Sequence, residues 1–250
     1  MTQAVDDGYY VRRRPRPDAR TVIGVVGEVL ITLGVIVFLF LAYELWFTGL
    51  YTAHAQSSLK SQLRNEWAHP APTVLPGESP GPSASAVPGL VEAPMPGDAI
   101  GLIRIPRLGS TYAYAIVEGV STDDLKKGPG HYPGTAMPGG IGNFVVSGHR
   151  TTYLAPFNGL GDLQVGDAIV IETRDTWYTY RVTGTETVLP TAVGVILPVP
   201  DKPHAKPTKA LITLTTCTPK YSASHRLVIE GQLQSKLPKS AGLPPALKGA

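Results

Sequence analysis

An almost unbroken apolar stretch near the N-terminus places the strongest constraint on how this chain of 250 residues folds. Between Thr21 and Phe47, only Thr32 and the acidic residues Glu28 and Glu44 interrupt the apolar character. A helix of this length measures roughly 40 Å, which exceeds the ~30 Å hydrocarbon core of a bilayer. A cleaved signal peptide has a shorter apolar region followed by a small-residue cleavage site. The stretch therefore predicts a retained transmembrane helix over residues 21–47.

Basic residues cluster on the N-terminal side of this stretch. Five arginines precede it, at Arg12, Arg13, Arg14, Arg16 and Arg20. Because positive charge is kept on the cytoplasmic side of a membrane, residues 1–20 are expected to form a cytoplasmic tail and the chain beyond residue 47 to be extracytoplasmic. The sequence thus predicts a single-pass protein of the cell membrane. The net charge of +3 resides largely in these arginines, which favours contact with anionic membrane lipid and not with nucleic acid.

Composition divides the rest of the chain into three parts. Residues 48–98 are expected to form an extracytoplasmic spacer, with some helical pattern over Ala53–Leu63 and eight prolines between His69 and Gly97. So much proline favours an extended, semi-rigid tether. Residues 99–235 are long enough for one folded domain with its own core. Residues 236–250 are again rich in proline, glycine and lysine, which predicts a disordered tail.

Strand patterns outnumber helix patterns in the folded domain. Seven segments are short, rich in apolar residues and bounded by turn residues: Ile100–Ile105, Tyr112–Val117, Asn143–Ser147, Ala168–Thr173, Trp177–Val188, Ala210–Thr216 and Arg226–Leu233. One segment, Ser121–Lys127, combines a capping residue with acidic residues in its first turn and predicts a short helix. Many short strands with few helices predict a mainly β fold, a small closed or nearly closed barrel.

The only cysteine of the chain, Cys217, follows directly on one of these strands. Side chains alternate across a strand, so Cys217 shares a face with Thr213 and Thr215. The next strand begins at Arg226, which the same alternation places on the face opposite to the core candidate Leu227. An antiparallel hairpin of these two strands therefore brings a thiol and a guanidinium together near one end of a sheet.

His149, in the segment Ser147-Gly148-His149-Arg150, can supply an imidazole to this pair. A thiol, an imidazole and a guanidinium together are suited to nucleophilic catalysis. His131 is the rival for the imidazole role, and Arg150 is the rival for the guanidinium role. A second cysteine or a tight His/Asp cluster is missing from the sequence, so neither a metal ion nor a cofactor is expected.

Two other classes of function compete with this interpretation. A lone cysteine is often a small buried apolar residue, as in a membrane-tethered binding module without catalytic activity. A cysteine peptidase that releases peptides by hydrolysis is the second competitor. Compartments outside the cytoplasm are oxidising, so an unpaired thiol there needs a functional explanation, and this favours an enzyme.

Three sequence segments together resemble the sortase family. They are Thr213–Cys217 followed by Arg226 with eight residues between Cys217 and Arg226, Asn143–Arg150 with its Ser-Gly-His string, and Gly130–Thr135. The resemblance covers nearly all of residues 99–233, and it is strong because the motifs occur together and in order. The extension after His149, the N-terminal anchor and the spacer are most similar to class E, the housekeeping sortases, with class D the nearest alternative. The resemblance implies an eight-stranded sortase-type β-barrel with short helices.

The resemblance also implies a reaction, namely cysteine transpeptidation of secreted proteins onto cell-wall peptidoglycan. Cys217 would attack the Thr–Gly bond of a C-terminal sorting signal and form an acyl-thioester. His149 would protonate the leaving amine and then help to deprotonate the incoming amine of the peptidoglycan precursor. Arg226 would hold the substrate and stabilise the oxyanion. A sortase that polymerises pilins is an alternative within the family.

Membership of class E would imply a Leu-Ala-x-Thr-Gly signal in place of Leu-Pro-x-Thr-Gly. Alanine offers a backbone N–H that proline lacks, and a hydroxyl can accept a hydrogen bond from it. Tyr112 is the expected acceptor, with Tyr114 as its rival. Thr215 and Thr216, directly before the cysteine, are also expected to contact the substrate.

Overall fold

The computed structural model describes residues 18–68 and 94–248, with the side chains of residues 44–47 excepted. Its residues divide into two compact units, one up to Glu44 and one from Leu45 onward, and each is described by itself. Most of the predicted cytoplasmic tail and most of the proline-rich segment lie outside the described residues.

The first unit consists of the N-terminal part of helix α1 (Ala19–Ala68). Its large apolar side chains are exposed, including Ile23 and Phe38, each with an exposed fraction of 70%. A helix that is apolar on all sides suits a lipid environment. Among the described residues, α1 is the one helix long and apolar enough to cross a membrane. This finding fits the predicted membrane anchor.

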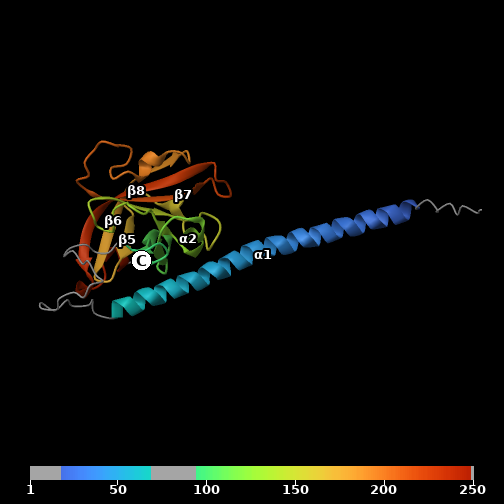
Figure 1. Ribbon diagram of the computed structural model, residues 1–250, viewed down its shortest axis with the longest axis horizontal. Helices are drawn as coiled ribbons and strands as arrows, with labels where there is room; N and C mark the ends of the chain where they lie inside the picture. Colours follow the sequence, from blue (N-terminus) through green and yellow to red (C-terminus); the bar gives the residue numbers. More distant parts are fainter. Residues whose placement is uncertain (1–17, 69–93, 249–250) are drawn as a thin grey trace, which may run out of the picture. The chain divides into compact units, whose positions relative to one another are not determined.

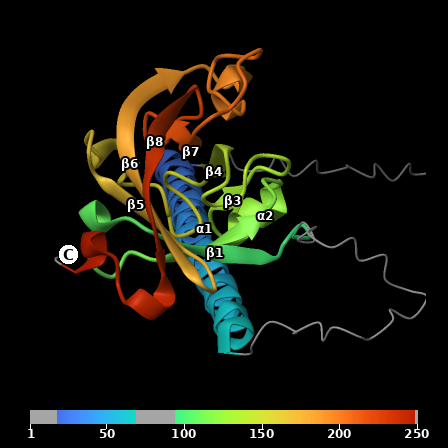
Figure 2. The ribbon, with the colours of Figure 1, turned by 90° about the vertical axis from the view of Figure 1, so that its left-hand side faces the viewer.

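The second unit is built on a closed barrel of eight strands (Figures 1 and 2). Around the barrel their order is β1-β2-β3-β4-β7-β8-β6-β5. Two neighbouring pairs, β2 with β3 and β4 with β7, are parallel, and the other pairs are antiparallel. The bounds are β1 (Ala99–Arg104), β2 (Tyr114–Glu118), β3 (Gly130–His131), β4 (Gly142–Ser147), β5 (Ala168–Glu172), β6 (Thr176–Val188), β7 (Ala210–Thr218) and β8 (His225–Pro238). The predicted mainly β, eight-stranded barrel is therefore confirmed.

Short helices fill the connections between the strands. Helix α2 (Thr122–Lys127) lies where the sequence predicted it, and the Ser121 hydroxyl accepts a hydrogen bond from the backbone N–H of Asp124 at 3.2 Å. The remaining helices are single 3₁₀ turns: η1 (Pro106–Leu108), η2 (Leu160–Asp162), η3 (Val193–Ile196), η4 (Lys239–Ala241) and η5 (Pro245–Leu247). Strand β3 was not among the seven predicted strands, because two residues are too few to show an alternating pattern.

The hydrophobic core fills the interior of the barrel. From β7, Ile212 and Leu214 point inward, and from β8, Leu227 and Ile229 do the same. The predicted alternation of these two strands is therefore correct. It follows that Cys217, three residues beyond Leu214, belongs to the outer face of the barrel.

The second half of α1 packs on the barrel, which corrects the sequence-based expectation of a spacer beginning at residue 48. Leu59 and Leu63 are buried against Leu102 of β1 and Val117 of β2. The Gln56 side chain accepts a hydrogen bond from the N–H of Ala115 and donates one to its carbonyl oxygen, at 2.8 and 3.0 Å. Because of these contacts, the folded unit also includes residues of α1 that precede its predicted start at residue 99.

The C-terminal segment is also part of the fold, which corrects the predicted disordered tail. Strand β8 continues to Pro238 and is followed by η4 and η5. The Lys239 ammonium forms an ion pair of 2.8 Å with Glu172 of β5 and lies 3.9 Å from the ring centroid of Trp67. Leu237 and Leu247 pack near Trp177. Charge pairing and apolar contacts thus anchor residues that looked unstructured by composition.

Candidate active site

The parallel strands β4 and β7 end side by side, and this brings the histidine segment to the cysteine. Their register pairs Ser147 with Thr215, so His149 and Cys217 each follow two residues later. The backbone N–H of Gly148 donates to the Thr215 carbonyl at 3.1 Å. Neighbouring parallel strands present their C-terminal ends at the same edge of a sheet, so His149 and Cys217 share one end of the barrel.

Arg226 completes the group from the next strand. It lies directly opposite Cys217 in the antiparallel ladder between β7 and β8. Its guanidinium Nη1 donates to the carbonyl oxygens of Ala223 and His225, at 3.1 Å each. Cys217 is a free, half-buried thiol. The structure therefore brings the three predicted catalytic residues together from β4, β7 and β8.

His149 has the environment of a proton acceptor. Its ring lies 4.8 Å from the ring of Tyr153 at an interplanar angle of 36°. Its Nε2 is buried and has no hydrogen-bond partner among the residues that the structure describes. Burial lowers the pKa of His149, because desolvation disfavours the charged imidazolium. The imidazole is therefore neutral at pH 7 and ready to accept a proton.

The loop that follows His149 has an unusual backbone. Tyr153, Leu154 and Ala155 have φ angles of 52°, 61° and 44°, all in the left-handed region that disfavours side chains with a Cβ. Such strain persists only where the surroundings enforce it. The N–H of Phe157 donates to the His149 carbonyl at 3.0 Å and closes the loop.

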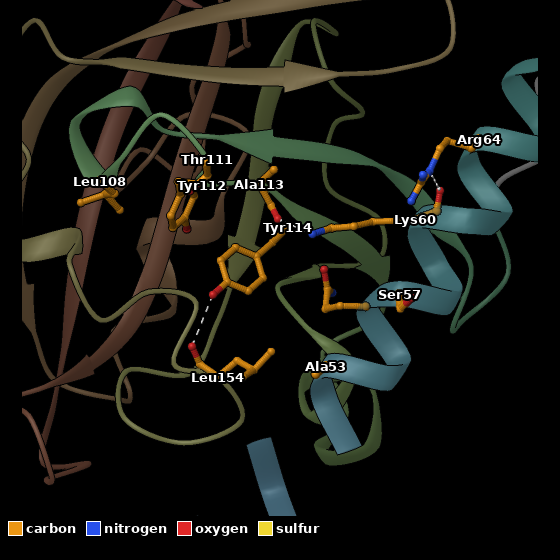
Figure 3. Close-up of a pocket in the computed structure, with 11 residues that line it drawn as sticks. Ala53, Ser57, Lys60, Arg64, Leu108, Thr111, Tyr112, Ala113, Tyr114 and Leu154 are labelled. Carbon is orange, nitrogen blue, oxygen red and sulfur yellow. Dashed lines mark hydrogen bonds between the residues drawn. The ribbon is translucent and has the colours of Figure 1, made fainter. Parts of the chain in front are cut away.

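Two tyrosine hydroxyls hold this loop from the side of β2. Tyr112 donates to the Pro156 carbonyl at 2.8 Å, and Tyr114 donates to the Leu154 carbonyl at 3.4 Å (Figure 3). Burial raises the pKa of both tyrosines, so both hydroxyls stay protonated and act as donors. Tyr112 lies just before β2 and not within it. Its oxygen can still accept a hydrogen bond, so its predicted contact with substrate stays a prediction.

These tyrosines also line a cavity of about 590 Å³ between α1 and the β1–β2 connection (Figure 3). On the α1 side, Lys60 donates to the Ala113 carbonyl at 2.6 Å and lies 5.7 Å from the ring centroid of Tyr114. Leu154 of the His149 loop forms part of the same wall. Lys60 thus fastens the second half of α1 to the β2 side of the barrel.

Thr215 and Thr216, the other predicted substrate contacts, are both buried. The Thr215 hydroxyl donates to the Ser147 hydroxyl at 3.0 Å, and the Thr216 hydroxyl donates to the Gly148 carbonyl at 2.7 Å. Both bonds tie β7 to the end of β4. In this structure the two threonines position the His149 segment, and their contact with substrate stays a prediction.

A second cavity, of about 110 Å³, lies beside Thr215 and Arg226. Its other walls come mostly from apolar residues of the β6–β7 connection, including Leu189 and Val193. The Asn143 amide holds this connection in place, donating to the carbonyl oxygens of Val195 and Leu197 at 3.0 and 3.1 Å. An apolar run outside the predicted strands, Val193–Val199, is the sequence feature that corresponds to this cavity wall.

His131, the rival of His149 for the imidazole role, has surroundings typical of a residue that stabilises the fold. His131 has an exposed fraction of 2%, and its Nδ1 lies 2.6 Å from the Glu118 carboxylate. Its Nε2 lies 2.8 Å from the Thr135 hydroxyl, and its ring stacks on Phe144. Every polar atom of the ring is engaged, so His131 has no site free for a reacting group.

A group of carboxylates lies away from this site, beside the β6–β7 connection. Burial, together with the charges of Glu186 and Asp201, raises the pKa of Glu230. Within residues 18–68 and 94–248, however, no group of three or more His, Cys, Asp or Glu residues has an arrangement that could hold a metal ion. This part of the barrel carries no assigned chemistry.

Comparisons with known proteins agree with the fold and the arrangement of these residues. The family model for the sortase domain matches residues 103–234, which is more than half of the chain. The chain belongs to the sortase family. Sortase SrtE1 of Streptomyces coelicolor is 36% identical over 245 residues, which cover 94% of this chain and 64% of that relative. This chain thus spans less than two thirds of the length of SrtE1.

Solved structures point in the same direction. The structure of sortase E from Streptomyces avermitilis has a TM-score of 0.57 and 43% identity, and the match covers 62% of this chain and 99% of that one. Sortase E1 from Streptomyces coelicolor with a tripeptide in its active site has a TM-score of 0.57 and 37% identity, with the same coverage. The predicted resemblance of this sortase to class E is therefore confirmed.

Proposed function

We propose that this sortase is a membrane-anchored cysteine transpeptidase that joins secreted proteins to cell-wall peptidoglycan. The observation that carries the proposal is the meeting of Cys217, His149 and Arg226 at one end of the barrel, from three neighbouring strands. A half-buried thiol on the outer face, a neutral imidazole from the neighbouring strand end and a permanent cation opposite the thiol provide a nucleophile, an acid–base group and an anion-stabilising group.

The first half of the reaction cleaves the sorting signal. As the Cys217 sulfur attacks the carbonyl carbon of Thr in the Thr–Gly bond, the thiol gives its proton to neutral His149, and the carbonyl oxygen gains negative charge. Arg226 stabilises this charge with its fixed cation. The C–N bond then breaks, His149 in its protonated form gives a proton to the leaving Gly amine, and the Thr acyl group stays on Cys217 as a thioester.

The second half transfers the acyl group to the wall. An amine of the peptidoglycan precursor attacks the thioester carbon and loses a proton to neutral His149. The C–S bond breaks, the new amide bond is complete, and Cys217 leaves as a thiolate. The lowered pKa of His149 supports this step, because a proton acceptor must be neutral at the working pH.

We further propose a Leu-Ala-x-Thr-Gly signal as substrate. The class E relatives support this, and one of them holds a tripeptide in its active site. The cavity beside Thr215 and Arg226 offers room for one aliphatic side chain next to the nucleophile. It would receive an apolar residue of the signal while the Thr–Gly bond reaches Cys217.

The orientation in the membrane is part of the same proposal. The five N-terminal arginines support a cytoplasmic N-terminus, with the barrel on the other side. A reporter enzyme that is active only outside the cytoplasm is therefore expected to be active when it is fused after Gly97. A reporter that works only in the cytoplasm would overturn this topology.

The reaction is tested with full-length protein in detergent and a Leu-Ala-x-Thr-Gly peptide. With an added amine, the expected product is the peptide joined to that amine through its Thr. Without the amine, a mass increase equal to the acyl fragment is expected on Cys217. Release of free acid alone, at every amine concentration, would identify a hydrolytic cysteine peptidase in place of a transpeptidase.

A further inference from the structure

The cavity between α1 and the β1–β2 connection has no part in the proposed reaction. Its volume of about 590 Å³ lies within the range of small-molecule sites, roughly 300–1,000 Å³. Its lining residues do not include Cys217, His149 or Arg226. A cavity of this size that the reaction leaves unused is a candidate site for a separate ligand.

One face of α1 supplies the positive charge of this cavity. The residues of α1 that line it are Ala53, Gln56, Ser57, Lys60 and Arg64. They follow the spacing of three and four residues that places side chains on one face of a helix. Lys60 and Arg64 therefore present two cations to the same wall, and Figure 3 shows Lys60 reaching from α1 toward Tyr114.

The protein does not neutralise these two charges. Among the residues that the structure describes, the cavity lining contains no aspartate or glutamate, and neither Lys60 nor Arg64 forms an ion pair. Both donate to backbone instead: Lys60 Nζ to the Ala113 carbonyl at 2.6 Å, and Arg64 Nε to the Lys60 carbonyl at 3.3 Å. An ammonium has three N–H donors and a guanidinium has five, so most of their donors are left for an external acceptor.

The carboxylate on this side of the barrel is already engaged. Glu172 lines a smaller cavity, of about 300 Å³, together with Lys60 and Arg64. Its two oxygens are paired with Arg104 and Lys239, at 2.8 Å each. Burial and the like charges of Arg104 and Arg64 lower the pKa of Lys60. A bound anion would relieve this repulsion between cations.

The remaining walls suit an organic phosphate. Ser57 and Thr111 line the cavity and are exposed, so their hydroxyls can donate hydrogen bonds to a ligand. Two cations and two hydroxyls match the charge and the several oxygens of a phosphate better than the two oxygens of a carboxylate. Leu108 and Leu154 add apolar surface for the carbon part of such a ligand.

We propose that this cavity binds a phosphate group, held by Lys60 and Arg64 with the hydroxyls of Ser57 and Thr111 as further donors. The same chemistry fits inorganic phosphate and the phosphodiester of a lipid headgroup. Leu154 belongs to the loop that follows His149, so the ligand lies against the loop next to the active site. The inference does not depend on the proposed function, because it involves neither the thiol nor a sorting signal.

The test is thermal unfolding of the full-length protein in an uncharged detergent, titrated with inorganic phosphate. Ionic strength is held constant with sodium chloride, so that charge screening does not change. A ligand that binds only the folded state raises the melting temperature, and the rise should be about 3–5 °C at ten times the fitted Kd. Lys60→Met should raise the Kd by ~10-fold or more, because it removes a charge-assisted hydrogen-bond donor.

Two control variants separate the site from a general effect of charge. Lys60→Arg keeps the cation and should keep most of the wild-type affinity. Arg181→Met removes one positive charge from a surface residue that is bonded to Gln234 and to the Gly166 carbonyl, and it should bind as the wild type does. If Lys60→Met does not fold, Arg64→Met replaces it, since the Arg64 side chain is exposed.

A second titration, with glycerophosphoglycerol as the soluble headgroup of an anionic phospholipid, distinguishes the two sources of phosphate. A Kd at least ~10-fold below that of inorganic phosphate would identify a lipid headgroup as the ligand, and an equal or higher Kd would identify free phosphate. The proposal is overturned if neither probe raises the melting temperature of the wild type. It is also overturned if the neutral variant at residue 60 or 64 binds as tightly as the wild type.

Discussion

The hydroxyl of Thr216 donates a hydrogen bond of 2.7 Å to the carbonyl oxygen of Gly148. The bond joins the residue before Cys217 to the residue before His149, and Thr216 has an exposed fraction of 2%. Because the bond is shielded from water, it couples the ends of β7 and β4 directly. The relative placement of the nucleophile and the imidazole therefore depends on this threonine.

Thr216→Val is expected to weaken both the fold and the reaction. Valine has the same shape but no hydroxyl, so the Gly148 carbonyl loses its partner, at a cost of about 1–2 kcal/mol in the free energy of unfolding. Loss of alignment should lower kcat by at least ~10-fold, since small displacements of reacting groups slow catalysis strongly. Denaturant unfolding and the peptide assay measure the two effects.

Thr213→Val is the control for this prediction. Thr213 lies on the same strand, is fully buried and donates to Asn143 at 2.8 Å, farther from the active end. It should lose a similar amount of stability but keep its kcat. An equal fall in kcat for the two variants would show that the Thr216 bond has no particular role in alignment.

Cys217→Ala should abolish turnover and leave the fold intact. Removal of a nucleophile lowers kcat by ~10³-fold or more. The side chain is half-buried at the end of β7, so the free energy of unfolding should change by less than about 1 kcal/mol. Peptide cleavage and thermal unfolding are measured together. Continued cleavage by the alanine variant would place the nucleophile elsewhere.

Substitution of His149 is expected to affect mainly the reaction rate, and substitution of His131 mainly the stability. His149→Ala should lower the rate by at least ~10²-fold, the usual effect of losing an acid–base group, with little loss of stability. His131→Ala leaves the Glu118 carboxylate buried without its partner, which should lower the free energy of unfolding by about 3 kcal/mol. A peptide assay in which His131→Ala is the slower variant would mean that the imidazole assignment is wrong.

The pH dependence of the amine-transfer step should reflect the buried position of His149. Its pKa is lowered by burial, so the imidazole stays neutral below the pH at which an ordinary histidine becomes protonated. Transfer from the thioester to an amine of low basicity should therefore persist on the acidic side of pH 6.5. Single-turnover measurements on preformed thioester test this. If the rate already falls to half of its maximum at a pH above 6.5 as the pH is lowered, the prediction is contradicted.

The same shift has a consequence for stability, with a defined sign. The unfolded chain binds a proton at His149 at higher pH than the folded chain does, so the free energy of unfolding should fall as the pH drops through 6.5. His149→Ala should reduce this slope. Because the ring is partly exposed, the effect is expected to be small.

Tyr112 is expected to influence the choice between Ala and Pro at the second position of the signal. Its hydroxyl donates to the Pro156 carbonyl and leaves lone pairs for the N–H of a bound Ala. Tyr112→Phe should lower the ratio of kcat/KM for Ala and Pro peptides by up to ~10-fold. Tyr114→Phe, whose hydroxyl bonds to the same loop, is the control. An unchanged ratio in Tyr112→Phe would exclude this hydroxyl as the selector.

Local sequence patterns were sufficient to predict much of the barrel and of its active end. The period-two alternation of β7 and β8 predicted that Cys217 and Arg226 share a face, and their ladder pairing agrees. The apolar stretch near the N-terminus likewise predicted a helix by its length alone. These features are encoded by neighbouring residues, so no distant partner is needed to recognise them.

Contacts between distant residues decided the rest. Leu59 and Leu63 show an ordinary helical spacing, and only the apolar surface of Leu102 and Val117 makes them part of the folded unit. Composition alone predicted a disordered C-terminal segment, whereas in the structure Lys239 of this segment forms an ion pair with Glu172. Strand β3 exists because its neighbours in the barrel pair with it on both sides.

The burial of Arg150 likewise depended on the tertiary structure. In the sequence it was a rival for the role of Arg226, since residue type alone does not tell a core-facing guanidinium from an exposed one. Burial is set by what the remaining strands and η2 place around a side chain, and chain neighbours do not specify this. The sequence determined which groups the active end contains, and the closed barrel decided which of them are buried and which lie on its outer face.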